Sequence, residues 1–353
     1  MKILVDGRVL TYKQARGMAV YLKHMLEEIS RRDHRNEYLI LVGRSPLKVD
    51  LNVGKNFRTI RFPSFPGVDE VFSIPLLVRR LKPDAVWFPA SVASMFIPRR
   101  IRVVTTIHDL IFLRCRERLF SYKWFGALYR KIFVRIAARN SCRIISVSGT
   151  VAEQISNKYP FARGKVRVVY SGIPERNCFD DSILKRLSLK PGYYIYSIAG
   201  TGLNKNIERL LKALPVFLVR NRRYKFVLTG VSGRETEHQD VVFTGYVTGC
   251  EKNSLLKNAA LFVLISTDEG FGFPALEAAS FGVPLLLADI PVFRELYGEI
   301  ALFVNPYSAE DICFGMERAL ENPVSYSIRK VLKEFSWTKA ATAVLEELNV
   351  SSA

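Results

Sequence analysis

The sequence has few cysteines and lacks any long uncharged apolar run. The cysteines are scattered, odd in number and without metal-ligand spacing, so we predict reduced thiols with packing roles. They are Cys115, Cys142, Cys178, Cys250 and Cys313. No 18-residue stretch is apolar and free of charge, so we expect no transmembrane helix. The first apolar run is too short for a secretory signal and stops at Asp6, which predicts a cytosolic protein.

Acidic residues are scarce in the first half of the chain. Residues 1–172 hold 32 Lys and Arg against 12 Asp and Glu, a balance of +20, whereas residues 173–353 hold 20 against 21, a balance of −1. The asymmetry predicts an anionic partner for the first half: a membrane surface, an anionic lipid carrier or a nucleic acid. No recognised nucleic-acid-binding motif accompanies this charge, so we expect no nucleic acid among the partners.

Both halves alternate short apolar runs with helix patterns. In a chain of 353 residues with 49% hydrophobic and 24% charged content, this indicates a globular α/β protein of two domains. Strands are predicted at 2–6, 38–42, 85–88, 103–107, 143–147 and 165–170, and then at 193–199, 225–230, 241–247, 259–265 and 284–288. The alternation predicts a doubly wound parallel sheet in each half. The mixed, proline-containing stretch 173–191 marks the boundary between them.

The most informative stretch is Ser266–Glu277. A buried strand precedes it, and a helix with proline in its first turn begins at Pro274. Gly270 and Gly272 lie between them and let the backbone approach a ligand closely. A helix start of this kind exposes backbone N–H groups to an anion such as a phosphate. Taken alone, the glycine turn is equally consistent with an ordinary connection between a strand and a helix.

Two glutamates raise the specificity of this stretch. Glu269 and Glu277 have seven residues between them and flank Gly-Phe-Gly-Phe-Pro, and Gly282-Val-Pro284 follows. This arrangement closely resembles the donor-site signature of retaining glycosyltransferases of family 4, the glycosyltransferase group 1 enzymes. The resemblance runs over nearly the whole chain and is strongest from Gly200 to Pro306.

The resemblance implies the GT-B fold, in which two Rossmann-like, doubly wound domains face each other across a cleft. Residues 1–172 would then form an acceptor-binding domain, and residues 173–335 a domain for the nucleotide sugar. Residues 336–353 would form a terminal helix that packs back on the first domain.

The resemblance places the donor contacts in the second domain. Lys205, at a helix start, matches a lysine that binds the donor diphosphate, and Glu277 matches a glutamate that binds the ribose. Glu269 would contact the sugar hydroxyls or stabilise positive charge at the anomeric carbon. The implied donor-binding residues are Gly200, Thr201, Lys205, Tyr246, Val247, Glu269, Gly270, Phe271, Gly272, Phe273 and Glu277. Many members carry an arginine at the position of Thr201, and Arg294 and Arg234 are the candidate substitutes.

His108 completes the predicted catalytic set with Glu269 and Lys205. In the family, the histidine of His-Asp-Leu lies in the cleft and faces the transferred sugar, and this role is carried over to His108. The alternative is a buried structural histidine. The basic N-terminal loop matches the family pattern at Asp6-Gly-Arg8, but Ala19 stands where many members have a second glycine.

The densest basic segment is predicted to form an amphipathic helix at 121–140. Its basic side carries Lys123, Arg130, Lys131, Arg135 and Arg139. Its apolar side carries Trp124, Phe125, Leu128, Ile132 and Ile136. Helices of this type lie on anionic bilayers. The alternative is that the apolar side packs on the sheet while the charges face water.

We therefore predict a retaining, metal-independent glycosyltransferase in surface polysaccharide or glycolipid synthesis. It would move a sugar from a nucleotide-diphosphate sugar, with GDP-mannose as the candidate donor, to a saccharide or lipid-linked acceptor. No cofactor besides the donor substrate is expected, and the sequence has no Asp-x-Asp motif of the metal-binding kind. The enzyme would lie peripherally at the inner face of the cytoplasmic membrane. The alternatives are a sugar-nucleotide epimerase of the same fold and a catalytically silent sugar-nucleotide-binding protein.

Overall fold

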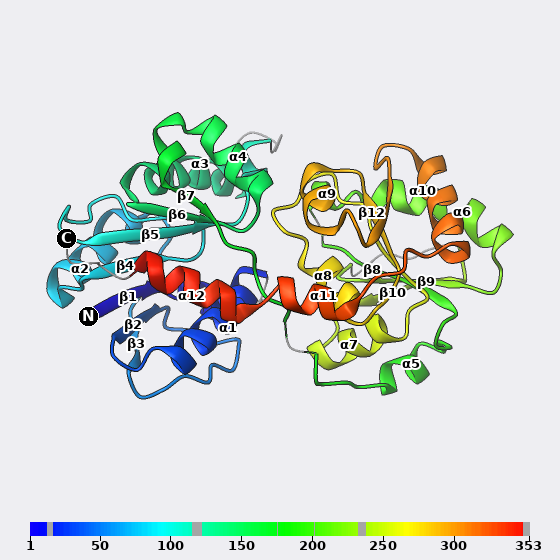
Figure 1. Ribbon diagram of the computed structural model, residues 1–353, viewed down its shortest axis with the longest axis horizontal. Helices are drawn as coiled ribbons and strands as arrows, with labels where there is room; N and C mark the ends of the chain where they lie inside the picture. The colour runs from blue at the N-terminus through cyan, green and yellow to red at the C-terminus, as the bar shows by residue number, and fades with distance from the viewer. Residues whose placement is uncertain (13–16, 115–121, 175, 201, 232–237, 349–353) are drawn as a thin grey trace. The chain divides into compact units, whose positions relative to one another are not determined.

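The chain folds into two compact units (Figure 1). The computed structural model describes residues 1–12, 17–114, 122–174, 176–200, 202–231 and 238–348. Unit 1 combines Met1–Gly172 with Phe335–Ala353, and unit 2 is Ile173–Glu334. Each unit has a parallel sheet and a hydrophobic core of its own.

Unit 1 is built on a seven-stranded parallel sheet in the order β3-β2-β1-β4-β5-β6-β7. The strands are β1 (Lys2–Asp6), β2 (Glu37–Val42), β3 (Phe57–Arg61), β4 (Ala85–Phe88), β5 (Arg102–Ile107), β6 (Arg143–Ser146) and β7 (Val166–Val168). The central strand β4 is apolar throughout, and β1 is apolar between Lys2 and Asp6, because helices cover both faces of the sheet. The strand order reverses between β1 and β4, which is where ligands of doubly wound sheets bind.

The helices of unit 1 form a layer on each face of this sheet. α1 (Gly17–Arg32) and the terminal α12 (Trp337–Leu348) pack together on one face (Figure 1). α2 (Ile74–Leu81) and α3 (Tyr122–Asn140) cover the other face, and α4 (Gly149–Lys158) lies beside β7. Short helices η1 (Arg8–Thr11), η2 (Asp69–Ser73), η3 (Ile111–Leu113) and η4 (Pro160–Lys165) lie in the connections.

The predicted apolar side of α3 is largely exposed. Phe125, Leu128 and Ile132 are 54%, 39% and 44% exposed, so these residues do not pack on the sheet as the alternative interpretation had them. Phe133 and Val134 are buried in their place, together with the small residues Ala127, Ala137 and Ala138. The alternative, in which the apolar side packs on the sheet, is wrong for these residues, because a different side of the helix, rich in alanine, is the one that is buried. Within the described residues, no helix has the length and apolarity needed to span a membrane.

Unit 2 repeats the architecture with a six-stranded parallel sheet in the order β10-β9-β8-β11-β12-β13. The strands are β8 (Tyr194–Ile198), β9 (Lys225–Thr229), β10 (Val241–Gly245), β11 (Leu261–Leu264), β12 (Leu285–Ala288) and β13 (Ala301–Val304). Its helices are α5 (Ser182–Arg186), α6 (Ile207–Arg220), α7 (Gly249–Lys257), α8 (Phe273–Ser280), α9 (Pro291–Tyr297), α10 (Ala309–Glu321) and α11 (Ile328–Glu334), with η5 (Leu203–Lys205) before α6. α6 and α10 bury apolar residues against one face of the sheet, and α6 continues through Pro215 without dividing.

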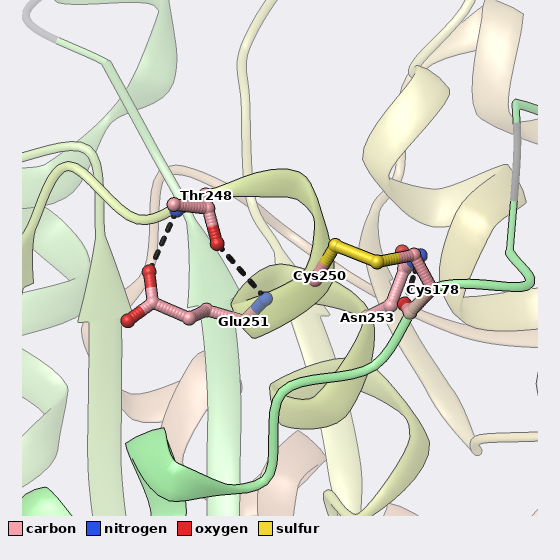
Figure 2. The surroundings of a disulfide bond; sticks show 5 residues. All are labelled: Cys178, Thr248, Cys250, Glu251 and Asn253. Atoms are coloured by element: carbon pink, nitrogen blue, oxygen red, sulfur yellow. Dashed lines mark hydrogen bonds between the residues drawn. A yellow bond between two sulfur atoms is a disulfide. The ribbon is translucent and has the colours of Figure 1, made fainter.

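Two cysteines form a disulfide, which contradicts the prediction that all thiols are reduced. Cys178 in the segment before α5 is bonded to Cys250 in the first turn of α7 (Figure 2). The fold brings their Cα atoms to 4.8 Å although they are 72 positions apart. Cys142 and Cys313 are free thiols, and Cys115 lies outside the described residues. The pairing was not foreseen because spacing in the sequence carries no information about this contact.

Candidate functional site

Glu269 and Lys205 form an ion pair at the carboxyl end of the unit 2 sheet. Glu269 follows β11, and Lys205 ends η5, the turn that follows β8. The Lys205 Nζ atom lies 2.5 Å from Glu269 Oε1, and the two side chains are 24% and 11% exposed. β8 and β11 are neighbours in the sheet, so their carboxyl ends bring these loops together. The structure thus joins two of the three predicted catalytic residues.

Two asparagines connect the loop that contains Lys205 to the loop that contains Glu269. Asn204 Nδ2 donates to the Asp268 carbonyl at 3.0 Å, and the Thr267 N–H donates to the Asn204 carbonyl at 2.8 Å. Asn206, in the left-handed conformation at φ +55°, donates from Nδ2 to the Ile265 and Pro306 carbonyls. The loop containing Lys205 is therefore fixed from both ends by backbone contacts.

The glycine turn before α8 requires glycine at position 272. Gly272 has φ +81°, and a Cβ atom there would lie 2.6 Å from Cε1 of Phe293. The buried Tyr297 hydroxyl donates to the carbonyls of Phe271 and Gly272 at 3.1 and 3.2 Å. Among the residues that the structure describes, no side chain caps the start of α8 at Gly272. The Tyr297 hydroxyl fixes the carbonyls of the turn, and the geometry of the turn suits the approach of an anionic group to the backbone.

Glu277, one turn inside α8, pairs with a residue that sequence reasoning missed. Its Oε1 atom lies 2.5 Å from Nζ of Lys252, and the side chains are 10% and 27% exposed. Lys252 belongs to α7, which packs beside α8. Nothing in the local sequence of α7 distinguishes Lys252 from a solvated lysine. The pairing depends on the contact between two helices.

The remaining predicted donor residues lie at the same edge of the sheet or outside the described residues. Gly200 follows β8, while Tyr246 and Val247 follow β10, with Tyr246 exposed and Val247 buried. Thr201 and the candidate cation Arg234 lie outside the described residues. The other candidate cation, Arg294, makes two 2.7 Å hydrogen bonds to Asp289, so its charge is already matched.

In unit 1, His108 follows β5 and is buried. A ring nitrogen, Nε2, lies 2.7 Å from the Pro89 carbonyl, and its backbone N–H donates to Ser91 Oγ at 3.0 Å. The edge of its ring meets Tyr21 with 4.8 Å between ring centroids. Burial lowers the pKa of His108 to about 4, although the Pro89 contact acts in the opposite direction. The imidazole is therefore neutral at physiological pH, with Nε2 as the donor to Pro89.

A buried ionic cluster occupies the carboxyl end of β1. The Arg8 guanidinium lies 2.7 Å from carboxylate oxygens of both Asp6 and Glu70, and 3.0 Å from Asp69. Tyr129 of α3 donates its hydroxyl to Glu70 at 2.6 Å. The cluster ties the Asp6-Gly-Arg8 motif to η2 and α3. Sequence reasoning missed it because Asp69 lies 61 positions from Arg8.

Comparison with known proteins assigns the chain to a family. Residues 15–176 match Glycosyltransferase Family 4, and residues 181–336 match Glycosyl transferases group 1. The chain belongs to glycosyltransferase family 4, group 1. This membership confirms the resemblance inferred from Glu269, Glu277 and the glycine turn between them.

The relatives of this family 4 chain include mannosyltransferases. Over 273 residues it is 30% identical to the serotype-specific mannosyltransferase WbdA of Escherichia coli. The aligned region covers 69% of this chain and 33% of WbdA. It is 26% identical over 370 aligned positions to a glycosyltransferase of Methanocaldococcus jannaschii, with 92% of both chains covered. The O-antigen chain mannosyltransferase RfbU of Salmonella typhimurium is 27% identical, and the aligned region covers 60% of this chain and 58% of RfbU. The chain thus spans about a third of the length of WbdA.

Solved structures confirm the predicted fold class. Sucrose-phosphate synthase from Thermosynechococcus elongatus matches with a TM-score of 0.71 and 16% identity, over 98% of this chain and 97% of that one. Anabaena HepE in complex with UDP and glucose matches with a TM-score of 0.70 and 15% identity, over 100% of this chain and 99% of HepE. The family 4 chain therefore has the GT-B fold, with one α/β sheet domain in each unit.

Proposed function

We propose that this protein is a retaining glycosyltransferase that uses a nucleotide-diphosphate sugar, with GDP-mannose as the donor. The observation that carries the proposal is the pairing of both signature glutamates with lysines at the carboxyl end of the unit 2 sheet. The names of WbdA and RfbU, both mannosyltransferases, support the choice of mannose. The acceptor would be a saccharide or lipid-linked glycan in surface polysaccharide synthesis, as the name of RfbU suggests.

Each charged side chain has a distinct part in this proposal. Glu277 accepts hydrogen bonds from the ribose hydroxyls, and Glu269 contacts the sugar or stabilises positive charge at its anomeric carbon. When the donor binds, Lys205 leaves Glu269 and pairs with the donor diphosphate. It then stabilises the negative charge of the diphosphate as this group departs. The bond between the anomeric carbon and the diphosphate oxygen breaks, a bond to the acceptor oxygen forms on the same face, and the acceptor proton passes to the diphosphate. The scheme needs no metal and no cofactor besides the donor, and in it His108 would face the transferred sugar.

The test is a thermal-shift panel of UDP-, GDP-, ADP- and TDP-sugars on the wild type and Glu277→Ala. A donor at a hundred times its dissociation constant should stabilise the protein by about 2.7 kcal/mol. We expect a shift with one nucleotide, lost in Glu277→Ala and kept in Glu321→Ala, which removes an exposed glutamate of α10. The absence of any shift would contradict the donor site.

Product analysis separates transfer from its alternatives. With the bound donor and a saccharide acceptor, we expect a new glycoside that keeps the anomeric configuration of the donor, read from the anomeric coupling constant by NMR. An epimerised sugar nucleotide would identify the enzyme as an epimerase, and an unchanged donor would identify a silent binding protein.

We also propose that unit 1 contacts an anionic membrane, which places the enzyme peripherally at the inner face of the cytoplasmic membrane. On α3, exposed Phe125, Leu128 and Ile132 lie among Lys131, Arg135 and Arg139. A second stripe runs from the segment before η2 into α2. It consists of Phe65, Val68, Phe72 and Leu76, each more than half exposed, with Arg79 and Arg80 at its end. Exposed apolar side chains next to cations suit a lipid surface of negative charge.

Vesicle flotation tests this partner. We expect binding to vesicles with anionic lipid, no binding to neutral vesicles, and about tenfold weaker binding for Phe72→Ser/Leu76→Ser. The matched control is Val216→Ser/Val219→Ser, which removes two exposed apolar residues from α6 of unit 2. Equal loss in both variants, or binding to duplex DNA in place of vesicles, would contradict the membrane proposal.

A further inference from the structure

The first turn of α7 is fixed in three ways. Thr248 and Glu251 form a capping box, in which the Thr248 hydroxyl accepts from the Glu251 N–H and the Glu251 carboxylate accepts from the Thr248 N–H (Figure 2). The disulfide bonds Cys250 to Cys178, and Asn253 Nδ2 donates to the Cys178 carbonyl at 3.0 Å. The cap, the covalent bond and the side-chain contact together leave this turn little freedom.

Lys252 lies inside this turn, directly after Glu251 and two positions after Cys250, and it reaches across to α8. Its Nζ donates to Oε1 of Glu277 at 2.5 Å. Within the described residues, Glu277 Oε2 takes part in no hydrogen bond, so one carboxylate oxygen is engaged and the other is available. Both side chains are largely buried, at 27% and 10% exposure, so the pair is screened less by water than a surface pair.

We infer that Lys252 is a positioning residue for donor binding: it holds the Glu277 carboxylate through Oε1 so that Oε2 faces the ribose hydroxyls, and the Cys178–Cys250 disulfide holds Lys252 in place. The inference rests on the proposed ribose-binding role of Glu277. A carboxylate whose side chain is locked by a counter-ion loses little freedom when the donor binds. The charge also matters, because Glu277 without Lys252 is a buried anion with no matching cation.

Calorimetric titration of the nucleotide sugar that gives the thermal shift tests the role of Lys252. We expect Lys252→Met to bind it about tenfold more weakly, with a raised KM and a much smaller change in kcat. Lys252→Arg should recover most of the affinity, because a guanidinium can also pair with Oε1. Lys212→Met, which removes an exposed lysine of α6, is the matched control and should bind like the wild type.

The outcomes separate the inference from the function on which it rests. Wild-type affinity in Lys252→Met, together with loss in Glu277→Ala, would overturn the role of Lys252 and leave the donor site standing. No nucleotide-sugar binding by the wild type would overturn the proposed function itself.

A second set of variants tests the disulfide. We expect Cys178→Ser/Cys250→Ser to bind the donor several-fold more weakly, because α7 then loses its covalent anchor. Added to Lys252→Met, the same pair should cause little further loss, since the lysine through which it acts is already gone. Independent, additive losses would overturn the coupling between the disulfide and Lys252. Thermal unfolding of each variant confirms that it is folded before it is titrated.

Discussion

At the residue scale, burial decides the charge of His108. The strand that precedes it is buried, and the ring is buried with it in unit 1, where the neutral imidazole is favoured over the cation. The Pro89 carbonyl then accepts from Nε2 and fixes the tautomer. A residue that the sequence marks as catalytic is therefore a neutral hydrogen-bonding group near neutral pH.

This burial predicts a loss of stability in acid. The pKa of His108 is about 4 in the folded chain and has its ordinary value of 6.5 in the unfolded chain. Between these two pH values the unfolded chain therefore binds a proton that the folded chain does not. The contribution is complete above pH 6.5 and falls as the pH drops, by about 2 kcal/mol between pH 7 and 5 at 1.36 kcal/mol per pKa unit. Urea unfolding of wild type and His108→Gln at both pH values measures it, with His34→Gln, which removes an exposed histidine, as the control. An equal loss in wild type and His108→Gln would show that another group is responsible.

At the element scale, local sequence signals set where several helices begin. Thr248-x-x-Glu251 is a capping box, and the Ser148 and Ser308 hydroxyls accept from the third backbone N–H of α4 and α10. These caps satisfy N–H groups that have no partner inside the helix. Such short-range signals act wherever they occur, independently of the rest of the fold.

Removing one cap should loosen one helix. We expect Thr248→Ala to lower the free energy of unfolding by about 1 kcal/mol, because the Glu251 N–H loses its acceptor. Thr248→Ser keeps the hydroxyl and should stay within about 0.5 kcal/mol of the wild type. Urea titration followed by circular dichroism measures both variants. A serine variant as unstable as the alanine variant would mean that the threonine methyl, and not the cap, is responsible.

At the scale of the whole molecule, the end of the chain completes unit 1. Trp337 stacks on His24 at 5.1 Å between ring centroids, and a Cβ atom at Gly172 would lie 2.4 Å from the Trp337 ring. Near the end of α12, Glu347 lies 2.9 Å from Arg167 and 3.2 Å from Arg143. Residues separated by 180 positions thus close one sheet domain.

Removing this carboxylate should destabilise unit 1. We expect Glu347→Ala to cost about 1–2 kcal/mol, because arginines of three adjacent strands lose a shared, largely buried partner. Glu346→Ala removes a neighbouring carboxylate that is 55% exposed and, within the described part of the chain, pairs with Arg167 alone, so it should cost less than about 0.5 kcal/mol. Thermal unfolding at low and high salt measures both, and salt should reduce the difference. Equal costs would contradict the shared-partner explanation.

The sequence by itself determined the fold class, the family and most of the sheet strands. Apolar runs of four or more residues between helix patterns are local, and burial on both faces of a sheet imposes them on central strands such as β4 and β11. The edge strands β3 and β13 escaped prediction. β3 is largely exposed and carries two arginines, which weakens its apolar pattern, whereas β13 is a short apolar run that was missed. The donor signature could be read because its glutamates lie close together in sequence.

Only the tertiary structure decided which side chains meet. The pairing of Lys252 with Glu277, the Cys178–Cys250 disulfide and the cluster around Arg8 each join residues 25 to 72 positions apart. No rule of spacing encodes such contacts, because they follow from how helices pack and where strand ends gather. The exposed apolar side of α3 was decided in the same way, since the space above the sheet selected small residues for burial. Local periodicity therefore determines the elements, and packing determines the partners of each side chain.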